Sequence, residues 1–167
     1  LEVMAQAASV LGKTSAAESY ASQAGKARAS FGRLYFDTKR GVFRDPSWAP
    51  AQGVEVFQTE QALAITLALD LQDAYDNISF YGDRSGFMNT PVPIVPAPGL
   101  QRAAQALANN IANRSANKSP HLNVGMVGIK YVLPALAATG HGDLALSALT
   151  AGDYPGYAFM VQNGEGT

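Results

Sequence analysis

Histidines, acidic residues and tyrosines are the side chains of this 167-residue chain whose types and positions could support chemistry. The two histidines are His121 and His141, and no cysteine and no HExxH pattern accompanies them. A metal site needs several such ligands at defined spacing, so no metal is expected. The chain also has no Gly-x-Ser-x-Gly nucleophile elbow and no phosphate-binding loop. We therefore expect no bound cofactor.

Two positions near the C-terminal end are candidates for ligand contact. His121 directly precedes an apolar helical stretch, and the free N–H groups and dipole of a helix start favour polar partners there. The imidazole could equally satisfy a loop hydrogen bond, and the sequence leaves both roles open. Tyr157 follows a Tyr-Pro-Gly run and offers its ring either for core packing or for stacking on a ligand.

Helices must position these residues, and two are predicted at the N-terminal end. Apolar residues at helical spacing indicate a helix over 3–11, which Gly12 would end. A longer apolar stripe predicts a second helix over 15–35, begun by a capping box of Ser15 and Glu18. The turn residues at 37–41 and the short extended stretch at 42–46 predict a loop or a small hairpin.

The helices predicted farther along the chain differ in polarity. Residues 62–69, which follow Gln58, are apolar nearly all round, so this helix should be buried in an inner layer. Prolines and glycines crowd residues 78–99 and predict a long loop. Further helices are predicted over 100–116, over 127–138 with a bend at Pro134, and over 142–150.

The six predicted helices alternate between wetter and drier ones, and no sheet is expected. Such alternation suits a toroid of paired helices with an inner and an outer ring. A complete toroid of six pairs has about twice as many helices, so the fold class is all-α, part (about half) of an (α/α)6 toroid. A scaffold of helix-pair repeats would also alternate, although the sequence has no fixed period.

Composition narrows the class of protein. With 47% apolar residues the chain can bury a core as one domain spanning 1–167. A net charge of −1 without a basic block argues against nucleic-acid binding, and no apolar run is long enough for a membrane span. Sequons at Asn77, Asn113 and Asn117 are compatible with secretion, but chance also produces such triplets, so the compartment stays open.

The order of several motifs resembles the C-terminal part of the catalytic domain of bacterial-type α-L-rhamnosidases. The motifs are QTEQALAITLALD at 58–70, HLNVGMVG at 121–128, YVLPAL at 131–136, GHGDLA at 140–145 and DYPGYAFMVQNG at 153–164. The resemblance implies a fragment of a six-hairpin (α/α) toroid glycosidase. The intact enzyme would hydrolyse terminal α-L-rhamnosides with inversion and without a redox cofactor. Its partners would be a rhamnose-containing glycan and the remainder of its own catalytic domain.

The same resemblance assigns roles to individual residues. Gln58, His121 and Tyr157 would face the substrate pocket. The catalytic acid of the family lies upstream of the matched region, and the base would fall a few residues beyond Thr167. No catalytic residue is therefore assigned, and Glu165 is expected to be a loop-end glutamate.

This chain departs from the family pattern at three places. Val124 stands where threonine is common, Tyr157 stands in place of tryptophan, and residues 78–99 look like an inserted loop. The departures keep a second class of function open: a non-catalytic relative that uses the helical toroid to bind a glycan or to pack in an assembly. If the chain is half a toroid, inner-helix residues such as those at 63–69 should be exposed in it.

Overall fold

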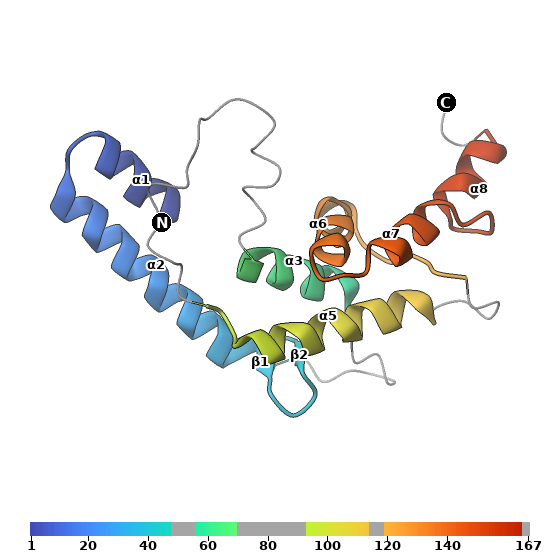
Figure 1. The fold of residues 1–167 in the computed structure, drawn as a ribbon, viewed down its shortest axis with the longest axis horizontal. Helices are drawn as coiled ribbons and strands as arrows, with labels where there is room; N and C mark the ends of the chain where they lie inside the picture. Colours follow the sequence, from blue (N-terminus) through green and yellow to red (C-terminus); the bar gives the residue numbers. More distant parts are fainter. Residues whose placement is uncertain (48–55, 70–92, 114–118, 165–167) are drawn as a thin grey trace.

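The computed structural model describes residues 1–47, 56–69, 93–113 and 119–164, and these segments are almost entirely helical (Figure 1). The elements, in chain order, are α1 (Glu2–Val10), α2 (Thr14–Tyr35), β1 (Phe36–Asp37), β2 (Val42–Phe43), α3 (Gln58–Leu69), α5 (Ala97–Ala112), α6 (Met126–Ala138), α7 (Gly142–Leu149) and α8 (Tyr157–Gln162). The predicted all-α class is confirmed.

The helices pack as neighbouring pairs. In Figure 1, α1 folds back along α2 on one side of the molecule, and α5 runs beneath α3 and α6 toward α7 and α8. The most extensive packing joins α3 to α6, and α3 also packs on α5. α6 then packs on α7. The drier helices α3 and α6 thus lie together, as the alternation of polarity predicted.

The hydrophobic core lies between α3, α5 and α6. Its largest fully buried aliphatic side chains are Ile65 of α3, Leu107 and Ile111 of α5, and Val132 and Leu136 of α6. On α5 the buried residues recur every three or four positions, which is the spacing of one helix face. Burial of this face explains why the stripe was visible in the sequence.

A two-stranded hairpin connects α2 to this core. Phe36 pairs with Phe43 and Asp37 with Val42 in antiparallel register. The buried Phe43 ring lies 5.0 Å from the Phe36 ring and 6.0 Å from the Phe31 ring of α2, between centroids. The sequence left a loop or a hairpin open at this point, and the structure has the hairpin.

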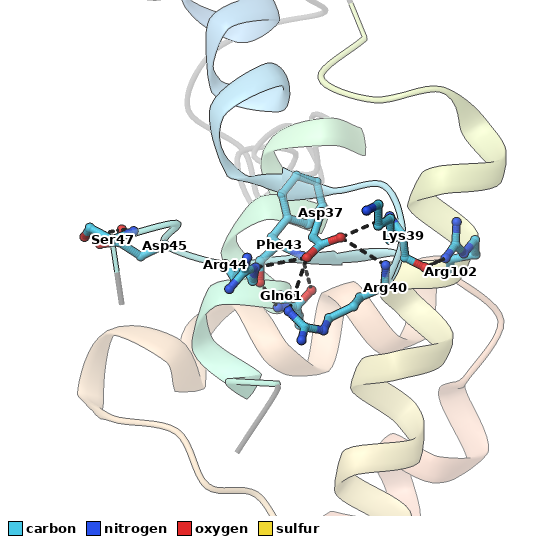
Figure 2. Close-up of polar contacts among 9 residues, drawn as sticks. All are labelled: Asp37, Lys39, Arg40, Phe43, Arg44, Asp45, Ser47, Gln61 and Arg102. Carbon is cyan, nitrogen blue, oxygen red and sulfur yellow. Dashed lines mark hydrogen bonds and ion pairs between the residues drawn. The ribbon is translucent and has the colours of Figure 1, made fainter. Parts of the chain in front are cut away.

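Polar contacts close the turn of the hairpin (Figure 2). The Asp37 carboxylate accepts hydrogen bonds from the backbone N–H groups of Lys39 (3.0 Å) and Arg40 (3.1 Å) and pairs with Arg44 Nε at 3.1 Å. The pKa of Asp37 is lowered, mainly by the hydrogen bond from the Arg40 backbone N–H, and burial opposes this shift. The bond from the Lys39 N–H and the charges of Arg44 and Arg40 lower the pKa further. The turn therefore holds Asp37 in its ionised form.

Two further side chains fasten the hairpin to α5 and α3. Arg102 of α5 donates to the carbonyls of Thr38 (2.8 Å) and Lys39 (2.7 Å). Gln61 of α3 is fully buried, accepts a bond from the Phe43 N–H at 2.9 Å and donates to the Phe43 carbonyl. The Gln61 amide thus bonds to both backbone groups of Phe43, as a residue on a neighbouring strand would. These bonds fix the first turn of α3 against the hairpin.

The start of α2 and the end of α5 differ from the sequence-based predictions. α2 begins at Thr14 with Lys13 as its N-cap and no capping side chain, so the predicted Ser15–Glu18 capping box is wrong. Backbone bonds from Gly12 and Lys13 to the end of α1 already form the turn, and Gly12 adopts a positive φ of 70° there. α5 ends at Ala112, and residues 114–118 lie outside the described part of the chain.

The start of α5 and the existence of α8 are the other differences. α5 begins at Ala97, so Pro98 and Gly99 lie in its first turn and not in a loop. Proline is tolerated there because a first-turn N–H has no helical partner to lose. Residues 93–96 of the predicted loop have no helix or strand, and 78–92 lie outside the described residues. α8 was not predicted, since it has six residues and none of them is buried.

The surface of α3 is only partly covered. Ala62, Ala64 and Ile65 are buried as predicted, whereas Leu67 and Leu69 are exposed. The predicted burial of this helix therefore holds for most of α3 but not for its last turn, where Leu67 and Leu69 lie. Among the described residues, no helix has the length and apolar character to cross a membrane.

Candidate functional site

The candidate site is the place where the first residues of α3, the loop before α6 and the loop before α8 are hydrogen-bonded to one another. We call this the helix-start junction and define it by Gln58, Asn110, His121, Asn123 and Asp153. The loops before α6 and α8 begin far from Gln58 in sequence. Because the first N–H groups of a helix lack helical partners, such a junction concentrates hydrogen-bonding groups at one end of the helical layers.

Gln58 is the centre of the junction and is only 2% exposed. Its Nε2 donates to Asn110 Oδ1 at 3.0 Å and to the His121 carbonyl at 3.2 Å, and its Oε1 accepts from the Asn123 N–H at 2.6 Å. Asn110 in turn donates to the Val56 carbonyl at 3.3 Å. Both amide donors of Gln58 are thereby used, and its side chain ties α3 and α5 to the loop before α6.

His121 joins this loop to the one before α8 and is 5% exposed. The backbone N–H of His121 donates to the Ile111 carbonyl at 3.1 Å. Its ring atom Nε2 lies 3.2 Å from Asp153 Oδ2. With the proton on Nε2 the imidazole donates to the carboxylate, and this tautomer leaves Nδ1 as a buried acceptor. Within the described residues, Nδ1 is the buried side-chain atom without a hydrogen-bond partner.

The carboxylate of Asp153 is held in its ionised form. The hydrogen bond from the Ser119 hydroxyl is the main cause that lowers the pKa of Asp153, and burial opposes it. A backbone bond and His121 lower the pKa further. The pKa of Glu60, in the first turn of α3, is raised instead, by burial and by the nearby Asp45 charge. Neutralisation of Asp153 would weaken its contacts to Ser119 and His121 together.

A pocket of about 280 Å³ lies beside the junction, between the starts of α6 and α8. Leu122 follows His121 into its wall, and Pro155 and Tyr157 contribute from the loop and first turn of α8. A Cβ added to Gly156 would overlap the Ala151 carbonyl, so a glycine is needed for the close turn that enters α8. Tyr157 is exposed at 39%, which places it at the wall of an open pocket.

Close packing of α6 on α3 also depends on one glycine near the junction. A Cβ at Gly128 would overlap Oγ1 of Thr59, and it would lie 3.0 Å from Cβ of Val124. Gly128 is buried, in the first turn of α6, and Thr59 follows Gln58. The absence of a side chain at 128 therefore sets how closely the two helix starts approach.

The three predicted substrate-binding residues fall into two groups. Gln58 and His121 are brought together, whereas Tyr157 lies in the neighbouring pocket. The sequence did not single out Asn110, Asn123 or Asp153 for the junction, although Asp153 opened one of the matched motifs. Glu165, expected to be a loop-end glutamate, lies outside the described residues. No group of three or more His, Cys, Asp or Glu side chains that could hold a metal occurs in the described part.

Helices packed as neighbouring pairs, with polar groups gathered where three of them start, are the elements expected of a six-hairpin helical domain. The family model described as the bacterial alpha-L-rhamnosidase 6 hairpin glycosidase domain matches residues 1–167, and the chain belongs to this family. The resemblance stated from the motifs is therefore confirmed. No curated protein matches the chain.

A solved structure of an alpha-L-rhamnosidase from Dictyoglumus thermophilum is similar to the chain, with a TM-score of 0.65 and 21% identity. The match covers 96% of this chain and 14% of that one. At this identity the likeness shows the fold, and the chain spans about one seventh of the length of the solved relative.

Proposed function

We propose that the intact protein hydrolyses terminal α-L-rhamnosidic linkages with inversion and needs no redox cofactor. Family membership supports hydrolysis of a glycoside. The observation that carries the location of the site is the helix-start junction, in which Gln58 and His121 join three helix starts through side-chain and backbone bonds. Helix starts present unpaired N–H groups, which suit the hydroxyl-rich surface of a sugar.

The two catalytic carboxyl groups come, in this proposal, from outside the described residues. Inversion requires one protonated and one ionised carboxyl group about 6.5–9.5 Å apart, with room for water between them. Asp153 is a poor candidate for either role, because it is bonded to Ser119 and His121 and its pKa is lowered. The remainder of the catalytic domain is accordingly the partner that completes the site.

The roles of the three substrate-facing residues differ in this proposal. Tyr157 is exposed beside the pocket and contacts substrate directly through its ring. Gln58 and His121 are buried, and their bonds hold the loops that surround the sugar. They are positioning residues, because Gln58 has both donors occupied and His121 retains only Nδ1 as a free acceptor among the described residues.

The test is to incubate the intact protein with 4-nitrophenyl α-L-rhamnoside and to follow the sugar product by proton NMR. We expect β-L-rhamnose to form first and then to mutarotate, because inversion exchanges the anomeric configuration. Initial formation of the α anomer would refute the inverting mechanism. Binding of a rhamnose-containing oligosaccharide without any turnover would refute hydrolysis and support the non-catalytic glycan-binding alternative.

A further inference from the structure

The turn of the hairpin carries more positive charge than negative charge (Figure 2). Lys39, Arg40 and Arg44 of the hairpin and Arg102 of α5 gather around one carboxylate, that of Asp37. The Asp37 side chain is only 16% exposed, and both of its oxygens already accept hydrogen bonds from the turn. The charge that the turn presents to solvent is therefore positive.

Two of these four cations have no acidic partner among the described residues. In that part of the chain Nζ of Lys39 makes no hydrogen bond or ion pair, and Arg102 bonds only to the carbonyls of Thr38 and Lys39. Both Lys39 and Arg102 are exposed. A carbonyl oxygen satisfies a donor without neutralising the guanidinium charge, and a guanidinium group has five N–H donors. Arg102 therefore keeps both its charge and further donors for a ligand.

The guanidinium group of Arg102 is held in position within the turn. Its bonds to the two carbonyls, at 2.8 and 2.7 Å, fix it across the hairpin. A Cβ added to Gly41 would overlap its Nε atom, so the turn has room for this side chain only because residue 41 is glycine. A guanidinium group that is already fixed loses little freedom when it pairs with an oxyanion.

Stability of the hairpin does not account for the excess of cations. Arg44 and two backbone N–H groups already satisfy the Asp37 carboxylate. The carbonyls that Arg102 binds are neutral, so a neutral donor would satisfy them as well. Gathering like charges costs folding free energy through repulsion. A cluster that carries this cost without a structural need points to an anionic ligand.

We propose that the hairpin turn, through Lys39, Arg40 and Arg102, binds the anionic groups, carboxylate or sulfate, of an acidic polysaccharide. Family membership favours a glycan as the carrier of these groups. A net charge of −1 without a basic block argues against a nucleic acid.

This surface lies apart from the proposed sugar site. Arg102 and Asn110 of the helix-start junction are about two turns apart on α5, or roughly 12 Å along its axis. The inference therefore goes beyond the proposed function, since it concerns attachment to a polymer and not the bond that is cleaved. It rests on family membership alone.

The test measures binding of the intact protein to immobilised polysaccharides by biolayer interferometry. Alginate supplies carboxylates, dextran sulfate supplies sulfates, and neutral dextran is the reference. At about 20 mM salt, where screening is weak, we expect at least one polyanion to bind about tenfold or more tightly than dextran, and binding to weaken at about 200 mM. The polyanion that binds identifies the group. If neither binds more tightly than dextran, the inference is overturned.

Two charge reversals locate the binding. Lys39→Glu removes no described side-chain contact and should weaken binding to the polyanion about tenfold. Lys13→Glu is the matched control, because Lys13 is also exposed, changes the net charge equally and lies at the opposite end of α2 from the hairpin. Its effect should be about twofold or less. Equal weakening by both would assign the binding to net charge and overturn the inference.

A milder variant and the choice of ligands keep the result decisive. If Lys39→Glu fails to fold by circular dichroism, Lys39→Gln replaces it, with an expected weakening of about threefold. Alginate and dextran sulfate contain no rhamnose, so their binding is independent of rhamnoside hydrolysis. A protein that binds a polyanion through the turn but does not hydrolyse rhamnosides refutes the proposed function and supports this inference. Hydrolysis without polyanion binding does the reverse.

Discussion

Replacing Gln58 tests whether the helix-start junction holds the loop before α6 in place. Gln58→Ala removes bonds to Asn110, to the His121 carbonyl and to the Asn123 N–H from a site that is 2% exposed. Each bond contributes about 0.5–1.5 kcal/mol net, and the groups left buried without partners cost more. We therefore expect local destabilisation of about 2–4 kcal/mol, part of which relaxation of the loop recovers.

Hydrogen–deuterium exchange of the intact protein measures this quantity locally. When an amide exchanges through reversible opening, a loss of 2–4 kcal/mol corresponds to roughly 30- to 1,000-fold faster exchange. The peptide that covers 119–125 reports it, since it contains the N–H groups of His121 and Asn123. Gln105→Ala is the control, because Gln105 on α5 makes only an exposed bond to Asn109 among the described contacts.

The reasoning would be refuted if exchange in this peptide changed by about twofold or less in Gln58→Ala. Gln58→Glu sharpens the test. The substitution keeps an oxygen that accepts from the Asn123 N–H. It replaces the donating Nε2 group with an oxygen, which then faces two acceptors, Asn110 Oδ1 and the His121 carbonyl. Burial and these acceptors raise the pKa of the new carboxyl group in the folded state. Its defect should therefore be smallest below the unfolded pKa of about 4.3 and should grow as pH rises through the folded pKa.

Three other predictions concern Gly128, Asp153 and the exposed leucines of α3. Gly128→Ala should lower the thermal midpoint of the intact protein by an amount equivalent to about 1–3 kcal/mol, because its Cβ overlaps Oγ1 of Thr59. Adding Thr59→Ala should recover part of this loss, and a full additive loss in calorimetry would contradict it. Asp153 has a lowered pKa, so its stabilising contribution is present above about pH 3.9 and is lost as pH falls through its folded pKa. Asp153→Asn should abolish this pH dependence when hydrogen–deuterium exchange of the 119–125 peptide is measured over an acid titration. Residues 1–167 expressed alone should self-associate in analytical ultracentrifugation because Leu67 and Leu69 are exposed, and Leu67→Gln with Leu69→Gln should reduce the association. An unchanged sedimentation profile in that double variant would count against uncovered inner-helix faces as the cause.

The helices that could be predicted were mostly those with a local pattern of apolar residues. The stripe on α5 and the apolar run of α3 are visible in sequence because burial recurs at the period of a helix. Boundaries were less predictable where the backbone alone makes the cap, as at Lys13, or where proline fits a first turn, as at Pro98. α8 was not predicted because a short helix without buried residues has no periodic pattern of apolar residues in its sequence.

The candidate site was only half predictable. Motif order pointed to Gln58, His121 and Tyr157, but no spacing rule connects His121 with Asp153, 32 positions away, or Gln58 with Asn110, 52 positions away. The packing of α3 on α5 brings Gln58 to Asn110, and the packing of α7 on α6 and of α8 on α7 brings the loops of His121 and Asp153 together. Asparagine is also a common surface residue, and only the partly buried bonds of Asn110 and Asn123 to Gln58 distinguish these two.

The sequence by itself determined the helical class, the alternation of wetter and drier helices and the family. These properties depend on residue periodicity and motif order, which the chain carries locally. The tertiary structure alone decided that Gln58 is a buried link between loops, that His121 pairs with Asp153, and that an apolar pocket opens beside Tyr157. Burial, pairing and concavity depend on distances between residues far apart in the chain, and those distances exist only after the helices have packed.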